Sequence, residues 1–310
     1  MGLTDMIARY RRFLKRRNCS AHTVKNYLNI LNHFSAWLQV PLEQATYKET
    51  DAYMEHLLRR RMKPKTINCH LGCIHAFYDY LTEDERMPLT NPVRKNYRLR
   101  LPRPLPKHLR DEQVVTLFKE INDSRDRAMF MLMLRCGLRV EEVARLTVDA
   151  IEYRSRQLYV FNGKGSKDRV VYLSEDAQSA LEVYMQKRRW SKEKKVFLVQ
   201  KGPLRGKPLS VRGIQKRIEH YAQKTGTAVS CHHLRHTMAT QLLNADADLV
   251  TIQDLLGHSR ITTTQCYCRV SNLKVQRDYY KAINVVLQTT QPIRKDIFEG
   301  DKKGITDNRI

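Results

Sequence analysis

Arginine, histidine and tyrosine occur near the end of the chain at a spacing that suits chemistry on a phosphodiester. His232 and Arg235 stand three residues apart in CHHLRH, so on a helix they would share one face. His258 is followed nine residues later by Tyr267. A phenol with an unperturbed pKa of about 10 is a weak nucleophile at neutral pH, and a phosphodiester repels attacking lone pairs. Fixed positive donors would relieve both obstacles, because they attract the phosphate and stabilise a pentacovalent transition state.

A second arginine stands upstream in the segment CGLRVEEVARL, where Arg139 follows Gly137. Gly137 could adopt a positive φ, and the spacing of Val143 and Leu146 predicts the start of a buried helix. Glu142, three residues after Arg139, could hold the guanidinium in place. The alternative is an exposed i,i+3 ion pair worth only about 0.2–0.5 kcal/mol.

A predicted β-hairpin lies between the two arginine segments, in VFNGKGSKDRVVYL. Two β-rich runs flank Asn162-Gly163-Lys164-Gly165, which places Lys164 at the tip or shoulder. An ammonium on such a hairpin is well placed to protonate an alkoxide leaving group. An ordinary turn lysine is the commoner role at hairpin tips, so both interpretations stay open.

Taken in order, these residues resemble the active site of the tyrosine recombinases, the phage integrase family, and are most similar to its Xer-like and integrase branch. The match runs from about residue 105 to residue 267, through GLRxEE, GKGSKDRVV, HHLRH, LLGHS and TTxxxY. The catalytic set that the resemblance implies is Arg139, Lys164, His232, Arg235, His258 and Tyr267, with Glu142 in support.

The resemblance implies a site-specific DNA recombinase that cuts and rejoins strands through a 3′-phosphotyrosine intermediate. Tyr267 would be the nucleophile and Lys164 would protonate the 5′ oxygen. Such an enzyme needs neither ATP nor a metal ion, and it works as a homo-tetramer on paired sites in double-stranded DNA. A type IB topoisomerase and a non-catalytic DNA-binding protein are the alternatives. The target sequence, the recombination outcome and the need for a partner or accessory recombinase stay open.

Composition supports a polyanionic partner. The 310 residues include 56 Lys plus Arg against 32 Asp plus Glu, a formal net charge of +24. We expect no membrane association, since no run approaches about 18 apolar residues and no secretory signal opens the chain. Seven cysteines without a CxxC pair predict reduced thiols in a bacterial cytosol.

We predict a mainly α fold with a small β-sheet in the catalytic domain, an α+β class. Residues 1–92 read as a helical bundle that resembles the SAM-like core-binding domain of the family, with helices after Ser20 and over 50–61 and 65–81. Residues 93–107 read as a basic, proline-rich linker, 108–290 as the catalytic domain and 291–310 as a disordered tail. By resemblance, the two domains would form a C-shaped clamp on DNA.

Within the second domain we expect helices over 112–121 with Asp111 as the cap, 176–189, 211–225 and 275–287, and a strand over 196–199. Tyr279 would pack on the last helix, which could dock on its own protomer or on a neighbour. Asp246 occupies a turn position where the family often has glycine, and Asp tolerates the left-handed conformation. Cys268-Arg269 replaces the more usual small-polar and histidine pair after the nucleophile.

Basic residues outside the catalytic set are candidates for DNA contact. The linker would cross phosphates, and the helix over 211–225 would contact phosphate or the major groove. The residues are Arg94, Lys95, Arg103, Arg212, Lys216 and Arg217. The cluster Cys231, His232, His233 and His236 suggests zinc, but Arg235 within it would repel a cation, so an anion site is preferred and no metal is expected.

Overall fold

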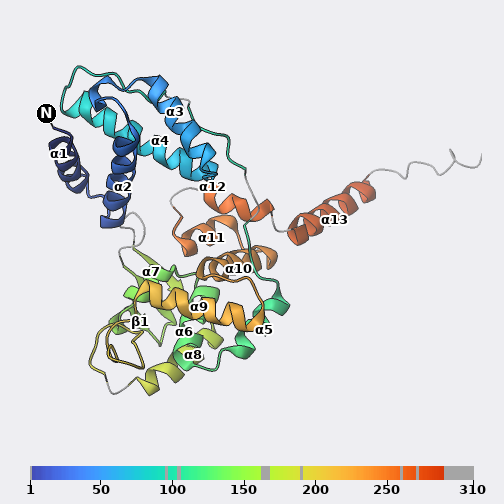
Figure 1. The fold of residues 1–310 in the computed structure, drawn as a ribbon. Coiled ribbons are helices and arrows are strands. Elements are labelled where there is room, and N and C mark those ends of the chain that lie inside the picture. The colour runs from blue at the N-terminus through green and yellow to red at the C-terminus, as the bar shows by residue number, and fades with distance from the viewer. Residues whose placement is uncertain are drawn as a thin grey trace, which may run out of the picture. The chain divides into compact units, whose positions relative to one another are not determined.

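The computed structural model describes residues 2–94, 97–102, 106–161, 168–188, 191–258, 261–269 and 272–289. The chain divides into two compact units, Met1–Arg103 and Pro104–Ile310 (Figure 1). Each unit has its own hydrophobic core. The predicted hairpin tip with Lys164, the linker residues Lys95 and Arg103 and the predicted tail 291–310 lie outside the described residues. None of the described helices is both long and apolar enough to cross a membrane.

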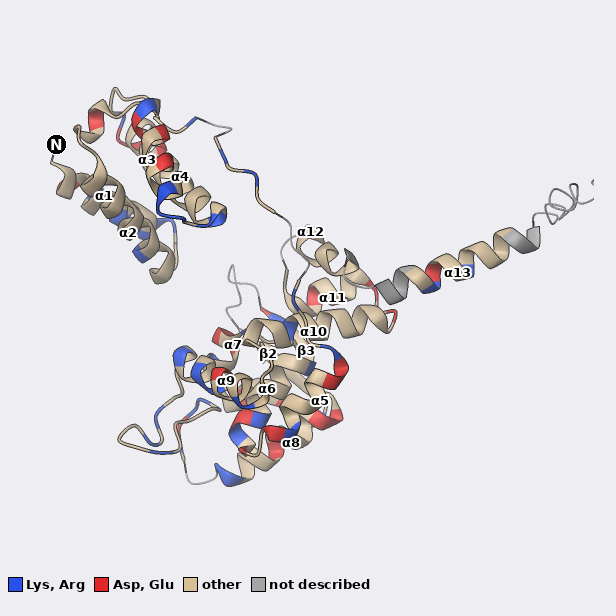
Figure 2. Ribbon diagram, turned by 45° about the vertical axis from the view of Figure 1, so that its right-hand side comes forward, with Lys and Arg blue, Asp and Glu red and all other residues tan. Residues whose placement is uncertain are grey.

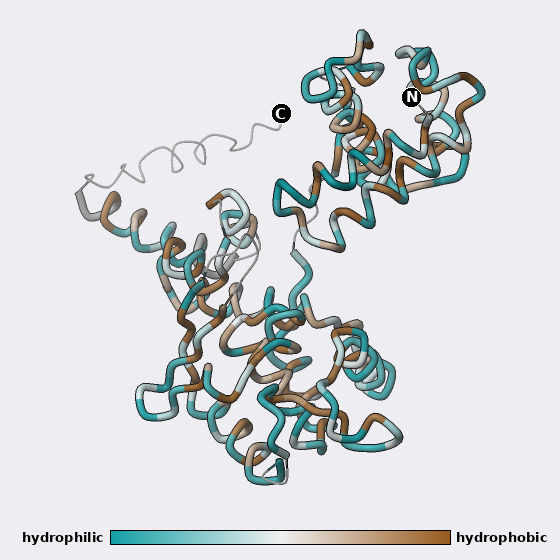
Figure 3. The backbone as a smooth tube through the Cα atoms, turned by 90° about the vertical axis from the view of Figure 1, so that its left-hand side faces the viewer, coloured by the Kyte–Doolittle hydropathy of each residue, from teal (hydrophilic) through white to brown (hydrophobic). Residues whose placement is uncertain are grey.

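The first unit is a helical bundle, as predicted. Its helices are α1 (Leu3–Arg16), α2 (Ala21–Trp37), α3 (Tyr47–Arg59) and α4 (Pro64–Asp79), with a short 3₁₀ turn at Leu42–Gln44 and a π-helical turn at Tyr80–Asp84. Apolar and polar residues follow one another along the helices (Figure 3). In this bundle α4 contacts both α2 and α3. The buried side chains at the centre include several aromatic ones, among them Tyr10, Phe34, Tyr53, Phe77 and Tyr78.

Local side-chain contacts explain where these helices begin. Ser20 accepts a hydrogen bond from the backbone N–H of Thr23 at 3.1 Å, which confirms the predicted cap of α2. The third helix begins three residues before the predicted start at 50. The cause is a capping box, in which Glu49 accepts the backbone N–H of Thr46 at 2.7 Å.

Part of the predicted linker is bound to the first unit by hydrogen bonds. Thr50 donates to the carbonyl of Pro92 at 2.9 Å in a buried hydrogen bond. The amide of Asn68 on α4 pairs with both backbone groups of Leu99, at 2.9 Å each. On the other side, Leu109 donates its N–H to Thr237 at 2.8 Å within the second unit.

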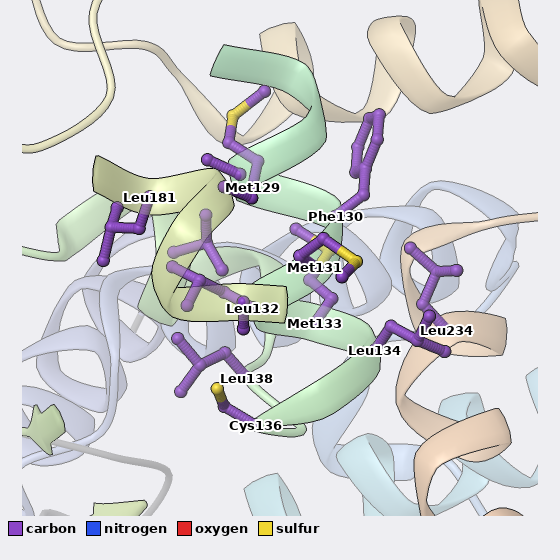
Figure 4. Packing of buried hydrophobic residues seen from close by; sticks show 14 of the residues in the cluster. Met129, Phe130, Met131, Leu132, Met133, Leu134, Cys136, Leu138, Leu181 and Leu234 are labelled. Atoms are coloured by element: carbon purple, nitrogen blue, oxygen red, sulfur yellow. The ribbon is translucent and has the colours of Figure 1, made fainter. Parts of the chain in front are cut away.

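The core of the second unit surrounds α6 (Ser124–Arg135), whose apolar run was predicted to be buried. Side chains from Ala128 to Leu134 are all buried, and α6 packs against α8 (Glu175–Lys187) and α10 (Cys231–Asn244). Figure 4 shows Leu181 of α8 and Leu234 of α10 on opposite sides of this helix. Around it lie α5 (Asp111–Glu120), α7 (Val140–Arg145) and α9 (Val211–Thr225).

The predicted hairpin is part of a three-stranded antiparallel sheet in the order β1-β2-β3. The strands are β1 (Ile151–Glu152), β2 (Gln157–Val160) and β3 (Arg169–Tyr172), preceded by a 3₁₀ turn at Val148–Ala150. Val160 pairs with Arg169 in the register of β2 and β3. Lys and Arg are frequent on α9 (Figure 2).

Two predictions of local structure were wrong. The run 196–199 is not a strand: it pairs with residues 207–209 through one isolated bridge, from Leu198 to Pro208. The hydroxyl of Tyr184 bonds to the carbonyl of Val196 and the N–H of Leu198, at 3.2 and 3.1 Å. Asp111 is the first residue of α5 and not its cap; it bonds instead to Gln241 on α10 at 2.7 Å.

The chain ends in α11 (Leu249–Leu256), α12 (Ile261–Thr264), a 3₁₀ turn at Gln265–Arg269 and α13 (Asn272–Thr289). Asp246, before α11, has φ +63°, which confirms the predicted left-handed turn. Arg277 attaches α13 to this turn through an ion pair with Asp246 at 2.9 Å. Tyr279 was predicted to pack but is 59% exposed, because it lies on a face of α13 that the rest of the unit does not cover.

Candidate active site

Arg139 lies where the chain enters α7. Gly137, just before it, has φ +65°, as the sequence predicted. The guanidinium of Arg139 donates to Glu142 at 2.8 Å and to the carbonyl of Gly257 at 3.1 Å. The Arg139 and Glu142 side chains are 16% and 8% exposed, so the alternative of an exposed i,i+3 pair is wrong. Arg139 is therefore held between α7 and the end of α11.

A third arginine, which the sequence analysis did not identify, also binds Glu142. Arg169, the first residue of β3, donates both terminal nitrogens to the two carboxylate oxygens of Glu142, each at 2.8 Å. Its Nε donates to the carbonyl of Leu255 at 2.9 Å. Burial would raise the pKa of Glu142, but Arg169 and Arg139 outweigh it and lower that pKa to about 2. Arg169 thus joins the hairpin to α7 and α11.

Arg235 lies on the buried face of α10, which Ser230 caps by accepting the N–H of His233. It is 4% exposed, and its guanidinium donates to the carbonyls of Gly137 and Leu256. Burial, together with the charge of Arg139, lowers the pKa of Arg235 to about 9, so it keeps its proton at neutral pH. Arg235 and Arg139 bind the carbonyls of successive residues, Leu256 and Gly257, which places both guanidiniums at one end of α11.

Tyr267 lies in the 3₁₀ turn after α12 and is 1% exposed. It packs with Met238, Leu243 and Ile252, and its hydroxyl is 2.7 Å from Nδ1 of His236 on α10. Burial raises the pKa of Tyr267 to about 12, while the charges of Arg235 and Arg139 act in the opposite direction. The phenol is therefore neutral, and it lies within electrostatic range of both arginines.

The two predicted histidines have different surroundings. His258 follows α11, and its Nδ1 lies 2.9 Å from the hydroxyl of Thr264. Burial, then Arg235 and Arg139, lower the pKa of His258 to about 4, so the imidazole is neutral at pH 7. His232 is exposed in the first turn of α10, with its ring 6.4 Å from that of His236. The structure thus brings Arg139, Arg235, His258 and Tyr267 together around the ends of α10 and α11.

The zinc interpretation finds no support in the donors of the Cys-His cluster. Burial raises the pKa of Cys231 to about 12, which opposes the thiolate that a metal needs. Nδ1 of His233 is engaged with the carbonyl of Ala228 at 3.2 Å, and His236 with Tyr267. In the described part of the chain, no group of three or more His, Cys, Asp or Glu side chains could hold a metal ion.

The candidate DNA-contacting residues that the structure describes are partly engaged within the protein. Arg94 is stacked on the ring of Tyr47, 4.1 Å from its centroid. On α9, Arg212 pairs with Glu219 at 3.0 Å, while Lys216 is exposed. Arg217 reaches into the core and pairs with the fully buried Asp126 at 2.5 Å.

Comparison with protein families gives two matches that together cover most of the chain. The model of the phage integrase family matches residues 107–274. The model of the phage integrase N-terminal SAM-like domain matches residues 6–86. The first match contains the arginines, the histidines and the tyrosine described above.

Curated relatives match over nearly their whole length. The chain is 31% identical to tyrosine recombinase XerC of Bacillus subtilis over 85% of this chain and 90% of the relative. It is 35% identical to tyrosine recombinase XerD of Pseudomonas aeruginosa over 82% of this chain and 89% of the relative.

Solved structures show the same fold. A lambda integrase (75-356) dimer bound to a COC′ core site aligns with a TM-score of 0.70 at 19% identity, covering 88% of this chain and 96% of that one. The Tn1549 transposon integrase in complex with a circular intermediate DNA aligns with a TM-score of 0.69 at 18% identity, covering 84% and 94%. The chain therefore belongs to the phage integrase family, the tyrosine recombinases, which cleave and rejoin DNA strands in site-specific recombination.

Proposed function

We propose that this recombinase breaks and rejoins double-stranded DNA by transferring one phosphodiester to Tyr267 and back. The observation that carries the proposal is the position of the two guanidiniums on successive carbonyls of Leu256 and Gly257, with the phenol of Tyr267 within their electrostatic range. Two fixed cations at one place create a site for one phosphate. A neutral tyrosine nearby supplies the nucleophile.

Each predicted residue has a role in this proposal. Arg139 and Arg235 bind the scissile phosphate, and His232 and His258 donate hydrogen bonds to its non-bridging oxygens. Tyr267 attacks phosphorus to form the 3′-phosphotyrosine, and Lys164 protonates the departing 5′ oxygen. The covalent bond conserves the energy of the phosphodiester, so neither ATP nor a metal ion is needed. Glu142 orients Arg139 through the contact at 2.8 Å.

The second unit supplies the chemistry and the first holds the DNA, with residues 1–92 as the DNA-binding domain, 93–107 as the linker and 108–290 as the catalytic domain. The net charge of +24 supports binding to the phosphate backbone of DNA. Arg94, Lys95, Arg103, Arg212 and Lys216 are the proposed phosphate contacts. Arg217 would have to leave its ion pair with buried Asp126 to join them, so we rank it last.

Strand exchange between two sites requires four active sites, so we propose a homo-tetramer on paired DNA sites. The apolar side chains that α13 exposes, including Tyr279 and Tyr280 at 59% and 55%, support docking of this helix on a neighbouring protomer. The task could be movement of a mobile element or resolution of multimers, with or without a partner recombinase. None of the seven cysteines forms a disulfide in the structure, which suits a bacterial cytosol.

Trapping on nicked DNA tests the proposed nucleophile. On a suicide substrate that loses the short fragment carrying the released 5′-hydroxyl, the wild type should accumulate a covalent protein–DNA adduct. Tyr267→Phe should bind DNA in a gel-shift assay and form no adduct, whereas Tyr279→Phe should behave as the wild type. Adduct formation by the Tyr267→Phe variant would show that the nucleophile lies elsewhere.

Relaxation of supercoiled plasmid separates recombination from topoisomerase activity. We expect recombinant products only on plasmids that carry paired sites. Efficient relaxation of plasmids without any site would favour the topoisomerase alternative.

A further inference from the structure

The nucleophilic hydroxyl has one contact that the mechanism above does not use. Oη of Tyr267 lies 2.7 Å from Nδ1 of His236, and the two rings are 5.6 Å apart. His236 directly follows Arg235 on α10, so the contact joins the phosphate-binding helix to the turn that carries the nucleophile. Among the described residues, His236 is the hydrogen-bond partner recorded for this hydroxyl.

Burial determines the direction of this hydrogen bond. Tyr267 is 1% exposed, and an unpaired buried hydroxyl hydrogen costs about 1–3 kcal/mol. The phenol therefore donates and Nδ1 accepts, which leaves the ring proton of a neutral His236 on Nε2. A lone pair of Nδ1 then faces the phenolic proton and can accept it.

The surroundings of His236 keep its ring neutral in this state. Burial is the main cause, and the neighbouring histidines and Arg235 add to it, so the pKa of His236 falls to about 4. The groups that face it from α10 and from the other packed elements are His108, His232, His233, Arg235, His258 and Tyr267. A base must be unprotonated before the reaction, and His236 meets that condition at neutral pH.

We propose that His236 is the general base of strand cleavage, a role that rests on Tyr267 being the nucleophile. As the bond from Oη to phosphorus forms and the bond from phosphorus to the 5′ oxygen breaks, the phenolic proton moves to Nδ1 of His236. The 5′ oxygen takes a separate proton from its own donor, for which Lys164 is proposed. The incoming negative phosphate stabilises the imidazolium that results. In rejoining, His236 returns its proton to the departing phenolate of Tyr267.

The test replaces the base and keeps the hydrogen bond. His236→Asn places an amide near the position of Nδ1, where it can accept the phenolic hydrogen bond but cannot take up a proton at neutral pH. Adduct formation on the nicked substrate, measured in a single turnover, should slow about a hundredfold while DNA affinity stays unchanged. His233→Gln is the matched control, because its ring contacts the carbonyl of Ala228 and not Tyr267. His236→Gln repeats the test if the Asn variant fails to fold.

Two further measurements distinguish a base from a positioning residue. Without a base, cleavage depends on spontaneous ionisation of a phenol whose pKa is raised to about 12, so the rate of His236→Asn should rise roughly tenfold per pH unit from about pH 6 to 9, and the wild type should not. A ring-fluorinated tyrosine at position 267 ionises more readily, so it should restore much of the lost rate in His236→Asn and change the wild type little.

The outcomes separate this proposal from the proposed function. If His236→Asn forms the adduct as fast as the wild type or faster, the contact only restrains the nucleophile and the proposal is overturned. Slow cleavage with an unchanged pH profile and no rescue by fluorotyrosine also overturns it, since that pattern belongs to misplacement of Tyr267. Adducts formed by Tyr267→Phe would instead defeat the proposed function itself.

Discussion

The second unit contains two buried regions that are stabilised in different ways. Around α6, apolar side chains from Ala128 to Leu134 pack with no charge among them. Around Glu142, three arginines are held by one carboxylate and by four backbone carbonyls, those of Gly137, Leu255, Leu256 and Gly257. The first region should tolerate apolar side chains of similar volume. The second requires each donor to meet one acceptor, because an unpaired buried charge costs several kcal/mol.

Truncation in the apolar region should give the largest loss of stability. Phe130 is fully buried and its ring lies 6.0 Å from that of Tyr221, so Phe130→Ala should lower the free energy of unfolding by about 3–5 kcal/mol. Denaturant titration measures the loss. Val115→Ala, at a position 53% exposed, should change stability by less than about 0.5 kcal/mol. Molecules of Phe130→Ala that remain folded should still form the DNA adduct. If a fully folded Phe130→Ala variant formed no adduct, the apolar region would contribute to catalysis as well as to stability.

Removing the charge of Glu142 should affect stability and catalysis together. Glu142→Gln leaves Arg139 and Arg169 without their carboxylate, which should cost about 3 kcal/mol and strongly reduce adduct formation. Glu219→Gln, which alters the exposed pair with Arg212, is the control and should cost less than about 1 kcal/mol.

The same carboxylate predicts a pH dependence. The pKa of Glu142 is lowered from 4.5 to about 2 in the folded protein, so its contribution is complete above about pH 4.5 and is lost as the pH falls toward 2. Stability measured over that range should fall less steeply in Glu142→Gln than in the wild type. Parallel curves would mean that other groups control acid unfolding.

A smaller effect is expected where the backbone itself holds the arginines. Gly257 has φ +59°, and an added Cβ would lie 3.0 Å from Cδ of Arg169. Gly257→Ala should cost about 1–2 kcal/mol and slow cleavage, because the carbonyl that binds Arg139 is displaced. Gly226→Ala, at φ +65° with nothing within 4 Å, should show a similar strain but normal cleavage. If the two variants cleaved DNA at the same rate, Gly257 would have no particular role in the active site.

The smallest change concerns the charged surface outside both regions. Arg212 lies on α9 with its side chain 64% exposed, so Arg212→Ala should leave stability within about 0.5 kcal/mol. If Arg212 contacts a phosphate, DNA affinity should fall equally on all sequences and the slope of log affinity against log salt should decrease by about 1. Lys119→Ala on α5 serves as the control, and identical salt slopes would remove Arg212 from the interface.

Sequence patterns predicted the apolar region better than the charged one. The helix over 211–225 has the predicted bounds, and the run in α6 is buried as expected, because burial of one helix face leaves a periodic signal. The family motifs identified Arg139, Arg235 and Tyr267, which the structure brings together. Arg169 was missed because an arginine beginning a short strand looks like any surface charge. The contact of His236 with Tyr267 has no sequence pattern of its own, and the sequence suggests His236 only as a metal ligand.

The backbone acceptors are the part of the site that is hardest to predict from sequence, because every residue has a carbonyl whatever its type. Nothing in the sequence of α11 indicates that the carbonyls of Leu255, Leu256 and Gly257 each bind a different arginine. The same holds at 196–199, where the hydroxyl of Tyr184 bonds to the carbonyl of Val196 and the N–H of Leu198.

The use of consecutive peptide groups at the end of α11 restricts how this helix can evolve. Each inserted or deleted residue would rotate the terminal carbonyls by about 100° about the helix axis. All three arginines would then lose, at once, the acceptors that the end of α11 provides. The number of residues from Leu249 to Leu256 is consequently under tighter constraint than the identity of the solvent-facing ones, so a change of length there would disable the enzyme without altering any catalytic side chain.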